Sequence, residues 1–187
     1  MIIAGIDEAG RGPLAGPVVA AAVILPEGHG IIGLDDSKKL SARKRAALEA
    51  EIKDKCQYAI GLAEPEEIDR INILQATMVS MKRAADGLMQ KPDHILVDGN
   101  RLPQWDYSAE YIIGGDALHA AISAASIIAK EYRDRLMLEA DAIYPVYGWA
   151  SNKGYGSKLH LEAIAKYGPT SLHRKSFKPM SQMTLDL

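Results

Sequence analysis

Acidic residues stand at the ends of three apolar segments that lie far apart in this chain. Asp7 and Glu8 end the first segment, Asp98 ends the second, and Asp116 follows the third after two glycines. A carboxylate at the end of a buried strand is unfavourable unless a cation compensates it. If the three strands are neighbours, their ends bring four carboxylates together, and such a cluster requires divalent cations to be tolerable.

The residue types indicate which cation and which reaction to expect. All four candidate ligands are carboxylates, while the chain has one cysteine, and its five histidines show no paired ligand spacing. Oxygen ligands favour Mg²⁺ or Mn²⁺ over Zn²⁺, and two such ions suit hydrolysis of a phosphodiester. The alternative is that each acid separately caps a loop, as an aspartate before a glycine does at Asp98-Gly99. The presence of acids at the ends of three separate apolar segments favours the metal site.

A glycine-rich turn, Gly10-Arg11-Gly12, follows the first pair of acids almost at once. Exposed backbone N–H groups beside two carboxylates suggest that metal and phosphate bind together. A solvated strand end with an arginine salt bridge is the alternative. The turn also matches the loose G-x-G-x-x-G/A dinucleotide fingerprint, but that motif must open a helix. The apolar run over 18–25 favours a strand instead.

The elements that must position these residues follow from hydrophobic periodicity and turn signals. Strands are expected at 2–7, 18–25, 57–63, 94–98 and 111–113, and helices at 41–55, 72–89, 120–140 and 158–167. Ser41 is the expected N-cap of the first helix. The first two strands are expected to pair as an antiparallel hairpin, and strands then alternate with helices. This order predicts a mixed-sheet α/β fold.

Composition and charge restrict the class of protein. With 187 residues, 48% of them hydrophobic and 25% charged, the chain fits one soluble domain over 1–187. A single cysteine, no signal peptide and no membrane-length apolar run predict a cytoplasmic protein without membrane association. Residues 150–180 carry a net charge of +5, whereas residues 1–149 carry −6. Such a basic segment can contact phosphates, or it can be a solvated surface.

Longer strings of sequence carry a resemblance to a known family. They are GIDEAGRGPLAGPV (5–18), DDSKKL (35–40), VDGN (97–100), GD (115–116), ISAASIIAK (122–130), RDR (133–135), NKGYGS (152–157), GPT (168–170) and HR (173–174). These strings resemble the motifs of the ribonuclease HII family, stand in the family's order and span nearly the whole chain.

The resemblance implies a ribonuclease H-like fold, a mixed five-stranded sheet flanked by helices, with 141–187 as a small C-terminal helical, substrate-binding extension. It implies an endonuclease that cuts the RNA strand of RNA–DNA hybrids and the 5′ side of single ribonucleotides embedded in duplex DNA. Two Mg²⁺ or Mn²⁺ ions are expected, with 5′-phosphate and 3′-hydroxyl products, and the enzyme is expected to be a monomer.

The resemblance also assigns roles to individual residues. Asp7, Glu8, Asp98 and Asp116 fall on the family's metal-binding, catalytic carboxylates. Gly10, Arg11 and Gly12 match the element that reads the ribose 2′-hydroxyl, and Tyr155 matches the tyrosine that packs against the sugar. Lys38, Lys39 and Lys153 are expected backbone contacts on charge grounds.

Two departures and several rivals accompany this assignment. The family usually has a lysine where this chain has Gly114, and Val-Thr where it has Glu131-Tyr132. Asp134 is the rival for fourth carboxylate, although Lys130 and Arg133 nearby favour a salt-bridged structural role. Rival functions are a junction resolvase, the sister ribonuclease HIII, which is expected to carry an additional N-terminal domain, and a non-catalytic nucleic-acid binding module.

Overall fold

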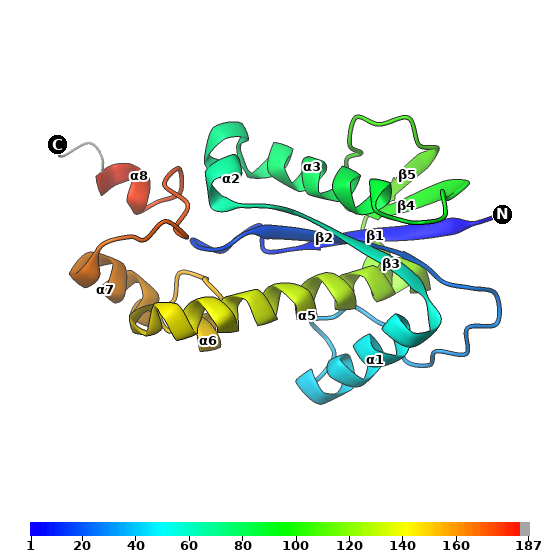
Figure 1. The fold of residues 1–187 in the computed structure, drawn as a ribbon, viewed down its shortest axis with the longest axis horizontal. Helices are drawn as coiled ribbons and strands as arrows, with labels where there is room; N and C mark the ends of the chain where they lie inside the picture. Colours follow the sequence, from blue (N-terminus) through cyan, green and yellow to red (C-terminus); the bar gives the residue numbers. More distant parts are fainter. Residues whose placement is uncertain (184–187) are drawn as a thin grey trace.

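A mixed five-stranded sheet forms the centre of the molecule, in the order β3-β2-β1-β4-β5 (Figure 1). The computed structural model describes residues 1–183. Its strands are β1 (Ile3–Ala9), β2 (Val18–Ile24), β3 (Gln57–Ala63), β4 (His94–Asp98) and β5 (Ala109–Ile112). β1 is antiparallel to β2, as the sequence predicted, whereas β1, β4 and β5 are parallel neighbours. The carboxyl ends of β1, β4 and β5 therefore lie at one edge of the sheet.

Helices cover both faces of this sheet (Figure 1). α1 (Ala42–Lys55) and the long α5 (Ala120–Ile143) lie on one face, and α2 (Pro65–Ile71) and α3 (Ile73–Asp86) lie on the other. The short α4 (Gly115–Leu118) connects β5 to α5. Ser41 caps α1 as expected, since its side chain accepts a hydrogen bond from the Lys44 N–H.

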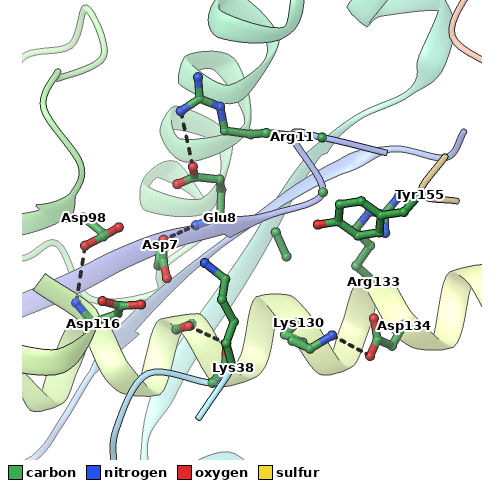
Figure 2. Close-up of a pocket in the computed structure, with 15 residues that line it drawn as sticks. Asp7, Glu8, Arg11, Lys38, Asp98, Asp116, Lys130, Arg133, Asp134 and Tyr155 are labelled. Carbon is green, nitrogen blue, oxygen red and sulfur yellow. Dashed lines mark hydrogen bonds and ion pairs between the residues drawn. The ribbon is translucent and has the colours of Figure 1, made fainter. Parts of the chain in front are cut away.

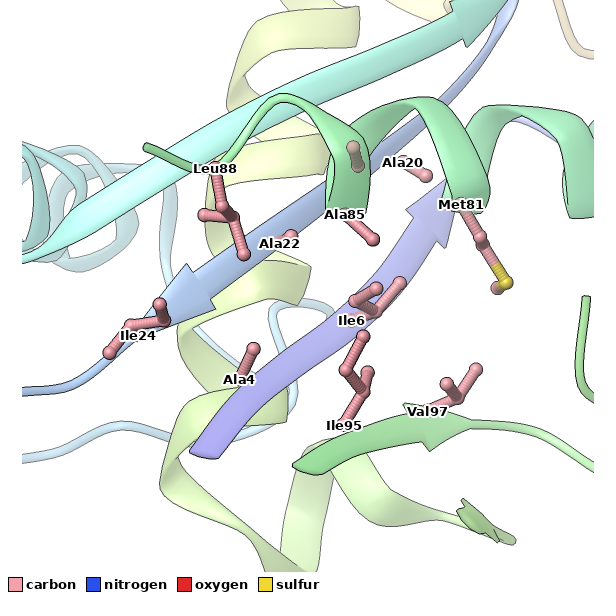
Figure 3. Close-up of a cluster of buried hydrophobic side chains, with 11 residues drawn as sticks. Ala4, Ile6, Ala20, Ala22, Ile24, Met81, Ala85, Leu88, Ile95 and Val97 are labelled. Atoms are coloured by element: carbon pink, nitrogen blue, oxygen red, sulfur yellow. The ribbon is translucent and has the colours of Figure 1, made fainter. Parts of the chain in front are cut away.

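Small residues in β2 allow helices to pack on both sides of the same strand. Successive strand side chains point to opposite faces. Ala20 and Ala22 accordingly join the core beneath α3, together with Ile6 and Met81 (Figure 3). Ala21 instead joins the core formed with α1 and α5. Every residue of β2 is buried, so the strand that pairs with β1 is rigidly held between two helical layers.

The C-terminal extension is helical, as predicted, and packs against the turn that follows β1. It contains η1 (Pro145–Tyr147), α6 (Trp149–Asn152), α7 (Lys158–Tyr167) and α8 (Met180–Met183). Trp149 and Ile164 of the extension share a buried cluster with Ala15 and with Met137 of α5. The extension and the turn after β1 are therefore parts of one packed unit. The last four residues of the predicted extension lie outside the described residues.

Some element boundaries differ from the sequence-based expectation. The single helix expected over 72–89 is preceded by α2, and the two are separated by Asn72, whose φ of 70° is incompatible with a continuous helix. Asp116 lies in the first turn of α4 rather than at a strand end. In the part of the chain that the structure describes, no helix is long and apolar enough to span a membrane.

Candidate active site

The four predicted carboxylates line one cavity at the carboxyl edge of β1, β4 and β5. The cavity has a volume of about 350 Å³. Besides Asp7, Glu8, Asp98 and Asp116, its lining includes Ala9, Gly10, Arg11, Gly12, Ser37, Lys38, Ser126, Lys130, Arg133, Asp134 and Tyr155. The expectation that strands distant in sequence gather these acids is confirmed, while their role as metal ligands stays a prediction.

Backbone geometry decides how each acid reaches the cavity. Asp7 and Glu8 are adjacent in β1 and point to opposite sides of the strand, as Figure 2 shows. Asp7 is 6% exposed, and its Oδ1 accepts a hydrogen bond of 2.7 Å from the Glu8 N–H. Asp98 ends β4, and its Oδ1 accepts from the Asp116 N–H at 3.3 Å. That contact ties α4 to the end of β4.

The electrostatics of the cavity disfavour the ionised acids. Burial raises the pKa of Asp7 well above its usual range, and the charges of Glu8 and Asp98 raise it further. Burial is also the main reason that the pKa of Glu8 is raised, although the charge of Arg11 opposes it. Burial first, and then the charges of Asp98 and Asp36, raise the pKa of Asp116. Burial and mutual repulsion therefore both disfavour the ionised form of these acids in the absence of a bound cation.

The donor set fits a hard divalent cation. The convergent acids offer only oxygen ligands, which Mg²⁺ and Mn²⁺ prefer, and their raised pKa values indicate charge that a cation would neutralise. Within residues 1–183, no three Asp, Glu, His or Cys side chains already stand close enough to form a metal-ligand group.

Two cations of the protein reach the acids. The Arg11 Nη1 lies 3.7 Å from the Glu8 Oε1, with the Arg11 side chain about half exposed (Figure 2). The charge of Lys38 opposes the rise in the pKa of Asp116. Both cations are exposed side chains, so they stabilise the carboxylates weakly. The arginine salt bridge proposed as an alternative from the sequence is present, but it involves one of the four acids.

The Gly10-Arg11-Gly12 turn is held from beneath by a buried arginine. The guanidinium of Arg174 donates to the carbonyls of Gly10, Arg11, Pro13 and Gly16 at 2.5 to 3.0 Å. Since these carbonyls point inward, the turn is fixed by its backbone rather than by its side chains. Burial and the charge of Arg133 lower the pKa of Arg174 to about 9, so it remains protonated at neutral pH.

Other groups approach the backbone of this turn closely at both of its glycines, and at Gly10 glycine is required. Gly10 has a φ of 94°, and a β-carbon there would stand 2.0 Å from the Arg133 Nε. A β-carbon on Gly12 would stand 3.2 Å from Cε1 of Tyr155. The Tyr155 ring therefore faces the glycine turn, as Figure 2 shows, and 53% of the residue remains exposed.

Some predicted contact residues lie outside the cavity. Lys39 and Lys153 do not line it. Lys39 pairs with Asp35 at 3.7 Å, and the Lys153 Nζ donates to the Ala150 carbonyl. Asp134 pairs with Lys130 at 2.9 Å, as the sequence suggested, although both residues line the cavity wall.

The sequence predicted the supporting role of neither Ser126 nor Arg133, since Arg133 was considered only as a charged neighbour of Asp134. Ser126 lines the cavity near Asp7 and slightly opposes the rise in the pKa of that acid, and its hydroxyl donates to the Ser37 Oγ at 2.8 Å. Arg133 is buried and donates to the carbonyls of Ala15, Pro17 and Lys153. Arg133 thus connects the turn after β1 to the loop that bears Tyr155. A serine on a helix and an arginine that binds distant carbonyls leave no local signal in a sequence.

Gly114, where the resembled family usually has lysine, is the N-cap of α4. Its φ is 67°, a left-handed conformation that glycine adopts without strain and that a lysine would adopt at some cost. No heavy atom outside its chain neighbours lies within 4 Å of the position that a β-carbon would occupy. The position is thus adapted to the backbone of the α4 turn rather than to a side-chain contact.

A mixed sheet of this order, flanked by helices and bearing acids at the ends of its central strands, defines a ribonuclease H-like nuclease fold. A model of the family Ribonuclease HII matches residues 4–180. Ribonuclease HII of Sphingopyxis alaskensis is 62% identical over 184 residues, which cover 98% of this chain and 92% of the relative. The chain belongs to the ribonuclease HII family, and it is a hydrolytic endoribonuclease.

Solved structures agree with this assignment. The crystal structure of ribonuclease H2 from Pyrococcus horikoshii superposes with a TM-score of 0.82 at 28% identity, covering 100% of this chain and 98% of that one. Bst-RNase HIII in complex with Mn²⁺ superposes with a TM-score of 0.77 at 17% identity, covering 70% of that chain. The second likeness shows the shared fold alone. Family membership is consistent with ribonuclease H activity on RNA–DNA hybrids, and it disfavours the ribonuclease HIII and resolvase alternatives.

Proposed function

We propose that this enzyme cuts the RNA strand of RNA–DNA hybrids and the 5′ side of single ribonucleotides embedded in duplex DNA, leaving 5′-phosphate and 3′-hydroxyl ends. The observation that supports this proposal is the convergence of two features on one cavity. Four carboxylates that can hold divalent cations line it, and beside them lie a glycine turn and a tyrosine ring that can read a ribose.

Asp7, Glu8, Asp98 and Asp116 are the proposed ligands of two Mg²⁺ or Mn²⁺ ions. When bound, the ions supply an activated water and stabilise the leaving oxygen. The raised pKa values of Asp7 and Asp116 support this role, because burial first and the neighbouring carboxylates second disfavour the ionised acids, and a bound cation would favour them. The hydrogen bonds from Glu8 N–H to Asp7 and from Asp116 N–H to Asp98 orient two of the carboxylates.

The proposed selectivity for a ribonucleotide depends on the 2′-hydroxyl, which alone separates RNA from DNA at one position. The Gly10-Arg11-Gly12 backbone would contact this hydroxyl, since glycines let a backbone approach a sugar closely. Tyr155 would offer its exposed ring to the adjoining sugar. Lys38 lines the cavity and is the best placed lysine for a phosphate. Lys39 and Lys153 could reach phosphates only further from the acids.

The decisive experiment incubates the enzyme with a DNA duplex that contains one ribonucleotide, with and without Mg²⁺, and sizes the products. The proposal predicts a single metal-dependent cut on the 5′ side of the ribonucleotide, and no cleavage of an all-DNA duplex or junction. Cleavage of the junction would favour a resolvase. A calorimetric Mn²⁺ titration without heat, together with binding but no cleavage, would favour a non-catalytic binding module.

We further propose that residues 1–187 form one domain that acts as a monomer in the cytoplasm. The buried cluster shared by the extension, Ala15 and Met137 supports the single domain. The basic balance of residues 150–180 supports substrate contact by the extension. Sedimentation of the free enzyme would test the monomer.

A further inference from the structure

Two buried histidines lie beneath the loop that carries Tyr155. His160 in α7 and His173 after it are 0% and 1% exposed, and their Nε2 atoms lie 3.0 Å apart. The Trp149 Nε1–H also points at the His160 Nε2, at 3.1 Å. On its other side, the His160 Nδ1 lies 2.8 Å from the carbonyl oxygen of Tyr155. These contacts form a continuous chain from His173 to the loop.

The partners of each ring nitrogen assign every proton in this chain. The Thr170 N–H donates to the His173 Nδ1 at 2.9 Å, so the proton of His173 must be on Nε2. That N–H donates to the His160 Nε2, which also accepts from Trp149. The His160 proton is therefore on Nδ1, where it donates to the Tyr155 carbonyl. Both rings are neutral in this arrangement.

The surroundings stabilise the neutral pair. A proton added to the His160 Nε2 would face two N–H donors. Tyr147 stacks on Trp149 with ring centroids 5.0 Å apart and lies edge-on to His173 at 4.8 Å. Burial lowers the pKa of both histidines, that of His173 to about 4 with a further contribution from His160. The pair is thus suited to hold a geometry rather than to transfer protons.

The backbone around His173 is also fixed to residues 14–16, which follow the Gly10-Arg11-Gly12 turn. His173 forms an isolated antiparallel bridge with Ala15. The Gly16 N–H donates to the Leu172 carbonyl and the Arg174 N–H donates to the Leu14 carbonyl, each at 2.8 Å. The pair of rings therefore connects residues 172–174, which bind residues 14–16, with the loop that presents Tyr155.

We propose that His160 and His173 are positioning residues, whose neutral hydrogen-bonded pair sets the place of the Tyr155 loop relative to the Gly10-Arg11-Gly12 turn. For its effect on selectivity, this inference rests on the proposed function, in which the two elements grip one ribonucleotide. Neither histidine lines the acidic cavity, so neither acts on the substrate directly.

Two substitutions at position 160 separate this role from a general contribution to stability. The amide nitrogen of asparagine takes the place of Nδ1, so His160→Asn keeps the donor to the Tyr155 carbonyl and loses the acceptor for His173 and Trp149. The amide of glutamine takes the place of Nε2, so His160→Gln keeps the acceptor and loses the donor. Both variants disturb the core, but they affect the Tyr155 loop differently.

The first measurement is amide hydrogen exchange of residues 153–157 in the free protein, which requires no substrate. The Ser157 N–H donates to the same Tyr155 carbonyl, so its exchange reports on the loop. We expect His160→Gln to speed this exchange about tenfold, the loss of one hydrogen bond. We expect the exchange rate of the Ser157 N–H in His160→Asn to stay within about twofold of wild type, even if His160→Asn has a lower unfolding midpoint than His160→Gln. Equal exchange in the two variants would overturn the inference.

The second measurement is the ratio of kcat/KM on a single-ribonucleotide duplex to kcat/KM on a long hybrid. This ratio should fall about fivefold to tenfold in His160→Gln and be retained in His160→Asn. If wild-type enzyme did not cut the single-ribonucleotide duplex at all, the proposed function would fail, while the exchange measurement would still decide the positioning role.

Nitrogen NMR of the wild-type protein needs no variant and so remains decisive even where both variants fail to fold. The expected spectrum at neutral pH has two neutral rings, His160 protonated on Nδ1 and His173 on Nε2. A charged ring, or the opposite tautomer of His160, would contradict the proposal.

Discussion

Gly12 faces the ring of Tyr155 so closely that a β-carbon on the glycine would stand 3.2 Å from Cε1. The turn after β1 and the loop between α6 and α7 thus meet at this point, 143 positions apart in the sequence. Because the two elements are the proposed sugar contacts, their separation is expected to set how well the enzyme distinguishes one ribonucleotide from a continuous RNA strand.

Gly12→Ala should displace the Tyr155 ring and lower kcat/KM on a single-ribonucleotide duplex by about tenfold, with a smaller loss on a long hybrid. The cause is steric, so the double variant Gly12→Ala with Tyr155→Ala should show less than the sum of the two single effects. Steady-state kinetics on both substrates provide the measurement. Full additivity of the two substitutions would contradict the contact.

Asp7→Asn should abolish cleavage, with a fall of at least about a thousandfold, yet stabilise the metal-free protein by about 1 kcal/mol. The asparagine Oδ1 can still accept from the Glu8 N–H, while the buried charge is removed. Urea unfolding in the presence of a chelator measures the free energy of unfolding. Asp54→Asn, which changes an exposed acid of α1, is the matched control and should alter neither quantity. A destabilised but active Asp7→Asn variant would refute both expectations.

Metal binding should release protons, and more of them at about pH 6 than at about pH 8. Burial, then Glu8 and then Asp98, raise the folded-state pKa of Asp7 above its ordinary 3.8. At pH values between 3.8 and this raised folded-state pKa, Asp7 holds a proton in the folded protein more often than in the unfolded chain. Without metal, ionisation of Asp7 therefore lowers the free energy of unfolding as pH rises. Mg²⁺ should reverse that slope by displacing the proton. Calorimetry in buffers of different ionisation enthalpy measures the release, and none at either pH would count against these ligands.

Arg174→Gln should destabilise the protein by about 3 kcal/mol, because four carbonyls of the turn after β1, three of them in buried bonds, lose a charged donor. Arg11→Gln is the matched control: its pair with Glu8 is 3.7 Å long and half exposed, so its removal should change stability by less than about 0.5 kcal/mol. Denaturant titration of both variants gives the comparison. Equal losses would show that the buried arginine does not hold the turn.

Much of the site could be predicted from the chain alone. Apolar segments that end in acids have a physical meaning at each position, since a strand must bury its side chains and an acid at its end must find a cation. Asp7, Glu8, Asp98 and Asp116 were therefore recognisable before the sheet order was known. The same holds for the β1–β2 hairpin and the Ser41 cap, both of which depend on local patterns.

The supports of the site were decided by tertiary structure. Arg174 bonds carbonyls that lie 158 to 164 positions before it. His160 lies only five positions from the Tyr155 carbonyl that it meets, but its ring is held there by Trp149 and His173 of the packed extension. Backbone carbonyls are chemically alike at every position, so no sequence pattern tells an arginine or a histidine which of them it will meet. The sequence therefore determined which groups do the chemistry, and only the folded chain determined which contacts hold those groups in place.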